Sequence, residues 1–146
     1  MKKLKIQLIP DGCWHSNLRY VLSKEQWDYI SKYVRKSAGG TCSICGAKTK
    51  NLDAHEVFDF DIKKGIQTLK DVIAVCKDCH SAIHMDFTSV KGDIVRAENH
   101  YMKVNNCSYV DMKKDLNLAH EKHKTLNRVD AWSLDVHTWL KAFLEL

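Results

Sequence analysis

The sequence predicts an α+β fold in which one domain of 146 residues is built around a metal site. Two Cys-x-x-Cys pairs lie thirty residues apart and can bind one ion between them. Strand-like segments between the pairs and helix-like segments on either side complete the pattern. We therefore expect residues 41–88 to form the core, with residues 1–40 and 89–146 as flanking elements packed on it.

The composition is that of a globular protein, with 45% apolar residues, 28% charged residues and a single proline. No apolar run approaches the roughly 20 residues of a membrane span, and the N-terminus lacks the apolar block of a secretory signal. We expect a cytoplasmic protein with no membrane partner. Two of its six cysteines, Cys13 and Cys107, lie outside the pairs and are expected to be separate reduced thiols.

Positive charge is concentrated in the first third of the chain. The net charge is +5, and residues 1–50 contain ten Lys or Arg but only three Asp or Glu. This segment could contact nucleic-acid phosphates, although a solvated surface explains the charge equally well. Residues 51–100 contain nine acidic and six basic residues, a balance that suits the surroundings of a cation.

Local patterns predict the elements of the first half. Alternating apolar residues ahead of a Pro-Asp-Gly turn predict a short N-terminal strand over residues 4–8. A capping-box pattern at Ser23, followed by apolar residues at helical spacing, predicts a helix over residues 24–37. Residues 52–58 and 66–75 are expected to be extended, the second segment with a break at Lys70-Asp71.

The second half is expected to be mainly helical. A helix that starts at Lys77 is expected to carry Cys79, the last of the four paired cysteines, together with His80 and His84. Capping residues predict two further helices, over residues 94–104 and 109–123. Residues 131–144 are too apolar to be a free tail, and we expect them to pack on the core as a strand that passes into a short helix.

The two cysteine pairs predict a structural Zn²⁺ site made by Cys42, Cys45, Cys76 and Cys79. Four thiolates complete the coordination of a tetrahedral ion, so no position is left for a substrate. An iron–sulfur cluster is the less favoured alternative.

Three histidines form a second candidate site. His80 and His84 are spaced i and i+4, so that on a helix both could chelate one cation. His55, on the preceding strand, could be a third ligand. Three protein ligands leave positions open for water and substrate, which is typical of a catalytic metal. Chance placement of the histidine pair on a surface is the alternative.

The segment from Cys42 to His84 resembles the HNH endonucleases, also called His-Me finger nucleases, in their four-cysteine zinc-containing branch. The residues that carry the resemblance are Cys42-x-x-Cys45, Leu52-Asp-Ala-His-Glu-Val57 and Asp71-Val-Ile-Ala-Val-Cys76-x-x-Cys79-His80-x-x-x-His84. The resemblance implies a treble-clef core of the ββα-metal type with a structural zinc. It also implies a second divalent ion, Mg²⁺, Mn²⁺, Ni²⁺ or Zn²⁺, at His55, His80 and His84.

Two positions depart from the family pattern. Glu56 stands where most members have the histidine that acts as general base, and Asp71 stands where they have the asparagine that positions it. Carboxylate is a weaker proton acceptor than imidazole, so Glu56 should drive water deprotonation less well. In an alternative register, His55 is itself the base and Asp53, on the same face of the strand, is the metal ligand.

The resemblance implies metal-dependent hydrolysis of DNA phosphodiester bonds that leaves 5′-phosphate and 3′-hydroxyl ends. Candidate contacts to the nucleic-acid backbone are Arg19, Lys32, Arg35 and Lys36. The second hypothesis is a catalytically weak or inactive protein of the same fold that binds nucleic acid or a protein partner in a regulatory role. A small module of this kind would be typical of a phage or mobile element.

Overall fold

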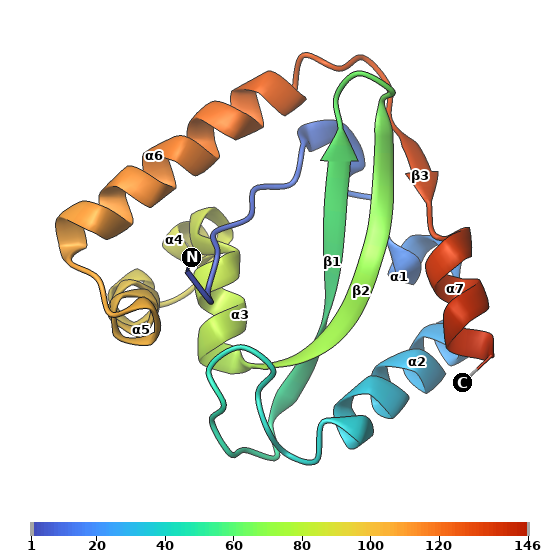
Figure 1. Cartoon of the computed structure of the whole chain (residues 1–146), viewed down its shortest axis with the longest axis horizontal. Coiled ribbons are helices and arrows are strands. Elements are labelled where there is room, and N and C mark those ends of the chain that lie inside the picture. Colours follow the sequence, from blue (N-terminus) through green and yellow to red (C-terminus); the bar gives the residue numbers. More distant parts are fainter. Residues whose placement is uncertain (1, 146) are drawn as a thin grey trace.

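The computed structural model describes residues 2–145 and has an α+β fold (Figure 1). In chain order, the elements are η1 (Asp11–Cys13), α1 (Leu18–Val21), α2 (Lys24–Ser37), β1 (Leu52–Asp61), β2 (Ile66–Cys76), α3 (Lys77–Ile83), α4 (Met85–Lys91), α5 (Ile94–Asn105), α6 (Tyr109–Leu126), β3 (Ser133–Asp135) and α7 (His137–Leu144). No helix in this part of the chain is both long and apolar enough to cross a membrane.

A long antiparallel hairpin of β1 and β2 is the centre of the fold. β3 pairs in parallel with the start of β2, so the strand order is β1-β2-β3 and β1 has a free edge. Val57 pairs with Asp71 and Phe58 with Leu69, which leaves Lys70 unpaired as a bulge. The break predicted at Lys70-Asp71 is thus a bulge within one continuous strand.

Helices cover both faces of the hairpin (Figure 1). α3 to α6 lie on one side of it, and α1, α2 and α7 lie on the other. Each side has its own apolar cluster. The first contains Val75, Ile83, Met85, Tyr101 and Met112. The second contains Leu18, Ala54, Leu69, Val72 and Val136. Helices that flank the hairpin in sequence thus lie on both of its sides: α5 and α6 on one, and α1, α2 and α7 on the other.

The predicted N-terminal strand over residues 4–8 does not form. Leu4 is fully buried, but its backbone N–H and C=O bond to the side chain of Asn105, at 3.0 and 2.8 Å. The Gln7 N–H donates to the carbonyl oxygen of Ile83 at the end of α3, at 2.9 Å. The alternating pattern thus reflects burial of an extended segment whose backbone partners belong to helices and not to a strand.

Most other elements agree with the sequence prediction. α2 has the predicted bounds and the Ser23 capping box, and the C-terminal segment forms β3 followed by α7. α3 is shorter than expected. It ends at Ile83, so His84 is the junction between α3 and α4, with φ −99° and ψ 54°. The six cysteines form no disulfide, and Cys13 and Cys107 are separate thiols, as predicted.

Candidate metal centres

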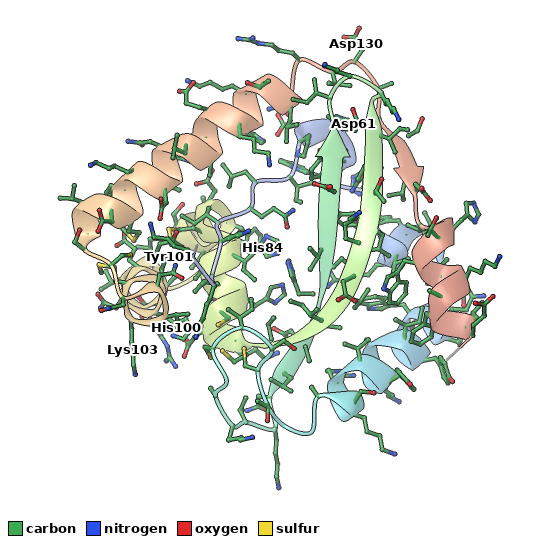
Figure 2. All side chains as sticks on the ribbon, in the orientation of Figure 1. Asp61, His84, His100, Tyr101, Lys103 and Asp130 are labelled. Atoms are coloured by element: carbon green, nitrogen blue, oxygen red, sulfur yellow. The ribbon has the colours of Figure 1, made fainter. Side chains whose placement is uncertain are left out.

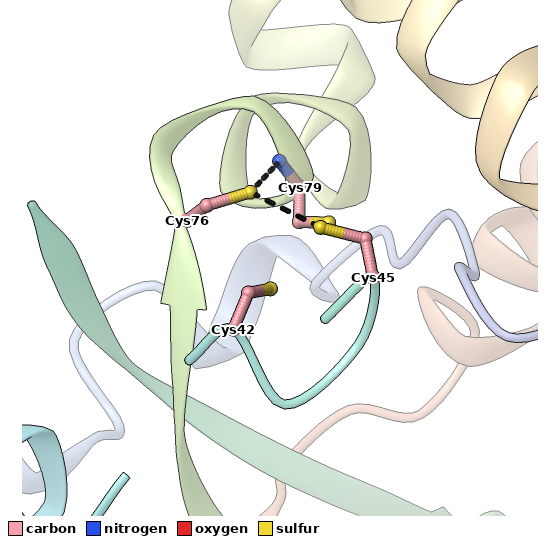
Figure 3. A group of neighbouring side chains, drawn as sticks. All are labelled: Cys42, Cys45, Cys76 and Cys79. Carbon is pink, nitrogen blue, oxygen red and sulfur yellow. Dashed lines mark hydrogen bonds between the residues drawn. The ribbon is translucent and has the colours of Figure 1, made fainter. Parts of the chain in front are cut away.

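The four paired cysteines converge at one end of the hairpin (Figure 3). Cys42 and Cys45 lie on the loop after α2, Cys76 ends β2, and Cys79 lies in the first turn of α3. Their sulfur atoms are all within 4.8 Å of one another. Gly46, with φ +77°, lets the loop turn back after Cys45, and its N–H donates to the carbonyl oxygen of Cys42 at 3.0 Å.

The spacing and chemistry of these thiols fit a tetrahedral ion such as Zn²⁺. The sulfurs of Cys45 and Cys76 are 3.7 Å apart, and four Zn–S bonds of about 2.3 Å would place ligand atoms about 3.8 Å apart. Burial raises the pKa of Cys76 to about 11. Burial also acts to raise the pKa of Cys42, but backbone N–H donors from Cys45, Cys76 and Ile44 lower it to about 7. A bound cation is what would keep all four as thiolates.

The three histidines form a second group on the side of β1 that faces α3. Their nearest ring nitrogens lie within 4.8 Å of one another, and the ring centres of His55, His80 and His84 are 5.0–5.4 Å apart. Figure 2 shows His84 between α3 and β1. Burial, reinforced by neighbouring imidazoles, lowers the pKa of His55 to about 3 and that of His84 to about 4. Both are therefore neutral at pH 7 and can each offer a lone pair to a cation.

Asp53 fixes the orientation of one of these imidazoles. The Nδ1–H of His80 donates to Oδ2 of Asp53 at 2.9 Å, while Oδ1 of Asp53 pairs with Lys77. The ring proton is thus held on Nδ1, and the lone pair of Nε2 is available to a metal. Asp53 shares a face of β1 with His55, as the alternative register requires. However, its oxygens are engaged by His80 and Lys77, and it is outside the three-histidine group.

Glu56 leaves β1 on the face opposite to His55, because successive side chains alternate along a strand. Its Oε2 accepts the N–H of Leu18, the first residue of α1, at 2.8 Å. Burial raises its pKa, and this N–H and the charge of Arg19 partly offset the increase. The charge of Arg19 also contributes to the lowered pKa values of His55 and His84, so this guanidinium is close enough to influence residues on both faces of β1.

Asp71 is bonded elsewhere. Its Oδ1 accepts the N–H of Val72 at 2.8 Å and Nε1–H of Trp139, on α7, at 3.4 Å. In the part of the chain that the structure describes, no hydrogen bond joins Asp71 to Glu56. The two residues occupy neighbouring positions of the β1–β2 ladder, but each carboxylate bonds to a different element, Glu56 to α1 and Asp71 to α7.

A cleft of about 240 Å³ lies beside β1, between α2 and α3. Its lining includes Arg19, Trp27, Ser31, Arg35, Asp53 and His80. The guanidinium of Arg19 lies 5.5 Å from the centre of the Trp27 ring, and Nε–H of Arg35 donates to the backbone oxygen of Ser31 at 3.1 Å. Two of the four basic residues proposed to contact phosphate thus border the cleft, whereas Lys32 and Lys36 lie elsewhere on α2.

His100, on α5, is a neighbour of the cysteine group that the sequence does not reveal. Its Nε2 lies 3.1 Å from the sulfur of Cys79. No spacing pattern joins it to either Cys-x-x-Cys pair, since α5 reaches the site only through packing on α3. The role of Asp53 as a partner of His80 is likewise visible only in the fold.

The two candidate metal-binding groups are adjacent, because Cys79 belongs to one and the next residue, His80, belongs to the other. Packing the short helix α3 against the hairpin therefore builds both groups at once. The comparisons with known proteins add no relative. The chain matches no protein-family model, and no curated protein or solved structure matches it significantly.

Proposed function

We propose that the chain is a metal-dependent HNH-type endonuclease that hydrolyses DNA phosphodiester bonds. The observation that supports this most is the convergence of His55, His80 and His84 beside a cleft lined by two arginines. Three nitrogen ligands leave coordination positions open, whereas four thiolates do not. The cysteine group accordingly has a structural role, and the histidine group has the catalytic one.

Each residue of the site has a distinct part in this proposal. Arg19 and Arg35 bind the phosphates of the strand, for which a guanidinium offers paired N–H donors. Asp53 holds His80 in its metal-binding orientation. A divalent ion at the histidines would supply charge stabilisation to the scissile phosphate and the leaving 3′ oxygen. Glu56 is assigned as the acceptor of the proton of the attacking water, a role that requires its carboxylate to leave the N–H of Leu18 and reach the side of β1 that bears His55. Burial makes this carboxylate a stronger base than an exposed one.

The test is nicking of a supercoiled plasmid by chelator-treated protein supplied with Mg²⁺, Mn²⁺, Ni²⁺ or Zn²⁺. We expect His80→Ala to abolish nicking, because it removes a metal ligand. His137→Ala is the matched control, since His137 is exposed at the start of α7, on the other side of the hairpin (Figure 1). Equal nicking by wild type and His80→Ala would show that these histidines do not carry the activity.

The base is tested separately by Glu56→Gln, which keeps the size of the side chain. If Glu56 is the base, nicking falls by about 10²–10⁴-fold while DNA binding stays unchanged. An unchanged rate would exclude Glu56 and favour His55 as the base. The metal content of the variant should equal that of the wild type, because Glu56 is outside the histidine group.

The second candidate is a protein of this fold that binds nucleic acid without efficient cleavage. It is favoured by the hydrogen bonds of Glu56 to α1 and of Asp71 to α7, because they engage both carboxylates outside the histidine group. Binding without nicking under every metal would support it.

Under both candidate functions, Arg19 and Arg35 contact phosphates. Arg19→Ala or Arg35→Ala should therefore reduce the slope of the logarithm of the binding constant against the logarithm of the salt concentration by about 1. Lys36→Ala, outside the cleft, should have a smaller effect.

A further inference from the structure

We infer that His100 is a positioning residue of the cysteine metal centre, whose imidazole N–H donates a hydrogen bond to the thiolate of Cys79. The inference depends on a metal ion at the four cysteines and not on nuclease activity. It is carried by the 3.1 Å separation between Nε2 of His100 and the sulfur of Cys79.

The position of the His100 ring is set by how α5 packs on α3. Arg96 and His100 are one helical turn apart on α5, and they contact the consecutive residues Asp78 and Cys79 of α3. Arg96 donates to both carboxylate oxygens of Asp78, at 2.7 and 3.2 Å. Tyr101, next to His100, is buried in the apolar cluster between the helices. The Arg96–Asp78 ion pair and the burial of Tyr101 thus fix α5 on α3, with the His100 ring beside the cysteine group.

The net negative charge of a zinc ion with four thiolates explains why a hydrogen bond to Cys79 would stabilise the centre. One Zn²⁺ and four thiolates leave two uncompensated negative charges, which need hydrogen-bond donors where water is excluded. Cys79 is fully buried, so solvent cannot supply such donors. The sulfur of Cys76 receives the backbone N–H of Cys79 at 3.3 Å, and the imidazole of His100 serves the sulfur of Cys79 in the same way.

The test compares His100→Leu with His100→Gln in the full chain. Leucine fills much of the space without a donor, whereas the glutamine Nε2–H can reach the position of the ring N–H. We expect His100→Leu to weaken Zn²⁺ binding by about 10–100-fold in competition with a chromogenic chelator. His100→Gln should stay within a few-fold of the wild type. In the Co²⁺-substituted protein, the thiolate-to-metal charge-transfer band should move to lower energy in His100→Leu alone.

Arg96→Ala is the control for helix packing, because it removes the other polar contact between α5 and α3 without touching a sulfur. It should leave the cobalt band unchanged. The inference is overturned if His100→Leu binds Zn²⁺ as the wild type does, or if Arg96→Ala reproduces both of its effects. It is also overturned if the wild type binds no metal at its cysteines. A chain that fails to nick DNA but shows the His100 effects would contradict only the proposed function.

Discussion

Asp53 orients one imidazole of the histidine group, that of His80. Its carboxylate accepts the Nδ1–H of His80 and is paired with Lys77. We expect Asp53→Asn to weaken Mn²⁺ or Ni²⁺ binding at the histidines by about 10-fold or more, because a neutral amide orients and polarises the imidazole less well. Calorimetric titration of zinc-replete protein measures this directly.

Asp78→Asn is the matched control for Asp53→Asn. Asp78 is on the same helix turn as His80, but it pairs with Arg96 on α5. It should leave metal affinity at the histidines close to that of the wild type. Equal losses in the two variants would mean that α3 has shifted as a whole, and the specific role of Asp53 would be wrong.

Tyr101 links the buried side of α5 to a charged pair. It is 2% exposed, and its hydroxyl donates to Oδ2 of Asp115 at 2.7 Å, where Lys2 also contacts the carboxylate at 2.8 Å. Because the bond is to a charged group, Tyr101→Phe should lower the free energy of unfolding by about 1.5–3 kcal/mol. Urea denaturation measures this, with Tyr109→Phe, on an exposed ring, as a nearly neutral control.

The effect of Tyr101→Phe should depend on pH. Burial acts to raise the pKa of Asp115, but the hydrogen bonds from Lys2 and Tyr101 lower it below its ordinary value. A carboxyl group with a lowered folded-state pKa stabilises the fold above its unfolded pKa, about 3.9, and loses this contribution as the pH falls further. The difference between wild type and Tyr101→Phe should therefore shrink below about pH 4. A constant difference would mean that Asp115 ionisation is not involved.

At the residue scale, the sequence predicts those site residues that are close to one another in the chain. The four cysteines and His80 with His84 follow from short spacings, and the structure brings each set together. His100 comes from a separate helix, so its contact with Cys79 depends on packing that no local pattern encodes. Asp53 was predicted only as an alternative metal ligand, because its partner His80 is on α3.

At the scale of elements, prediction succeeds where a helix or strand carries its own start and stop signals. α2 and α6 both begin at a serine capping box, and each begins where the sequence predicts. The N-terminal segment has only an alternating pattern, which an extended chain packed on helices shows as well as a strand does. α4 was not predicted, because no capping pattern separates it from α3.

The turn of the hairpin is an element whose sequence is strongly constrained. Gly65 has φ +65°, and a Cβ there would lie 3.3 Å from the carbonyl oxygen of Ala131, in the segment that leads to β3. Its own carbonyl accepts the N–H of Ser133 at 2.8 Å. We expect Gly65→Ala to destabilise the protein by about 1–2 kcal/mol through backbone strain alone, with more from the contact.

Thermal unfolding tests this prediction, with Gly12→Ala as the control. Gly12 has no positive φ, and a Cβ there would meet no atom within 4 Å. It should therefore have little effect on the midpoint. Equal midpoints for Gly65→Ala and the wild type would show that the hairpin turn relaxes without cost.

At the scale of the whole molecule, the cysteine group joins two parts of the chain that are far apart in sequence. It connects the loop after α2 to the junction of β2 and α3, and Cys42, Cys76 and Cys79 also belong to the first apolar cluster (Figures 1 and 3). The ion would also fix α3, which carries the histidines. Metal at the cysteines is therefore expected to control folding, and metal at the histidines is expected to control activity.

This separation predicts different responses to the loss of each ligand set. Binding of Zn²⁺ by four thiolates contributes about 10–16 kcal/mol in small zinc domains, as much as the stability of a typical domain, so Cys45→Ser or a strong chelator should abolish cooperative thermal unfolding. The double variant His80→Ala with His84→Ala should keep one equivalent of zinc by elemental analysis and a far-ultraviolet circular dichroism spectrum like the wild type. If chelation left the melting curve unchanged, the cysteines would not hold a folding metal, because no disulfide among them replaces it.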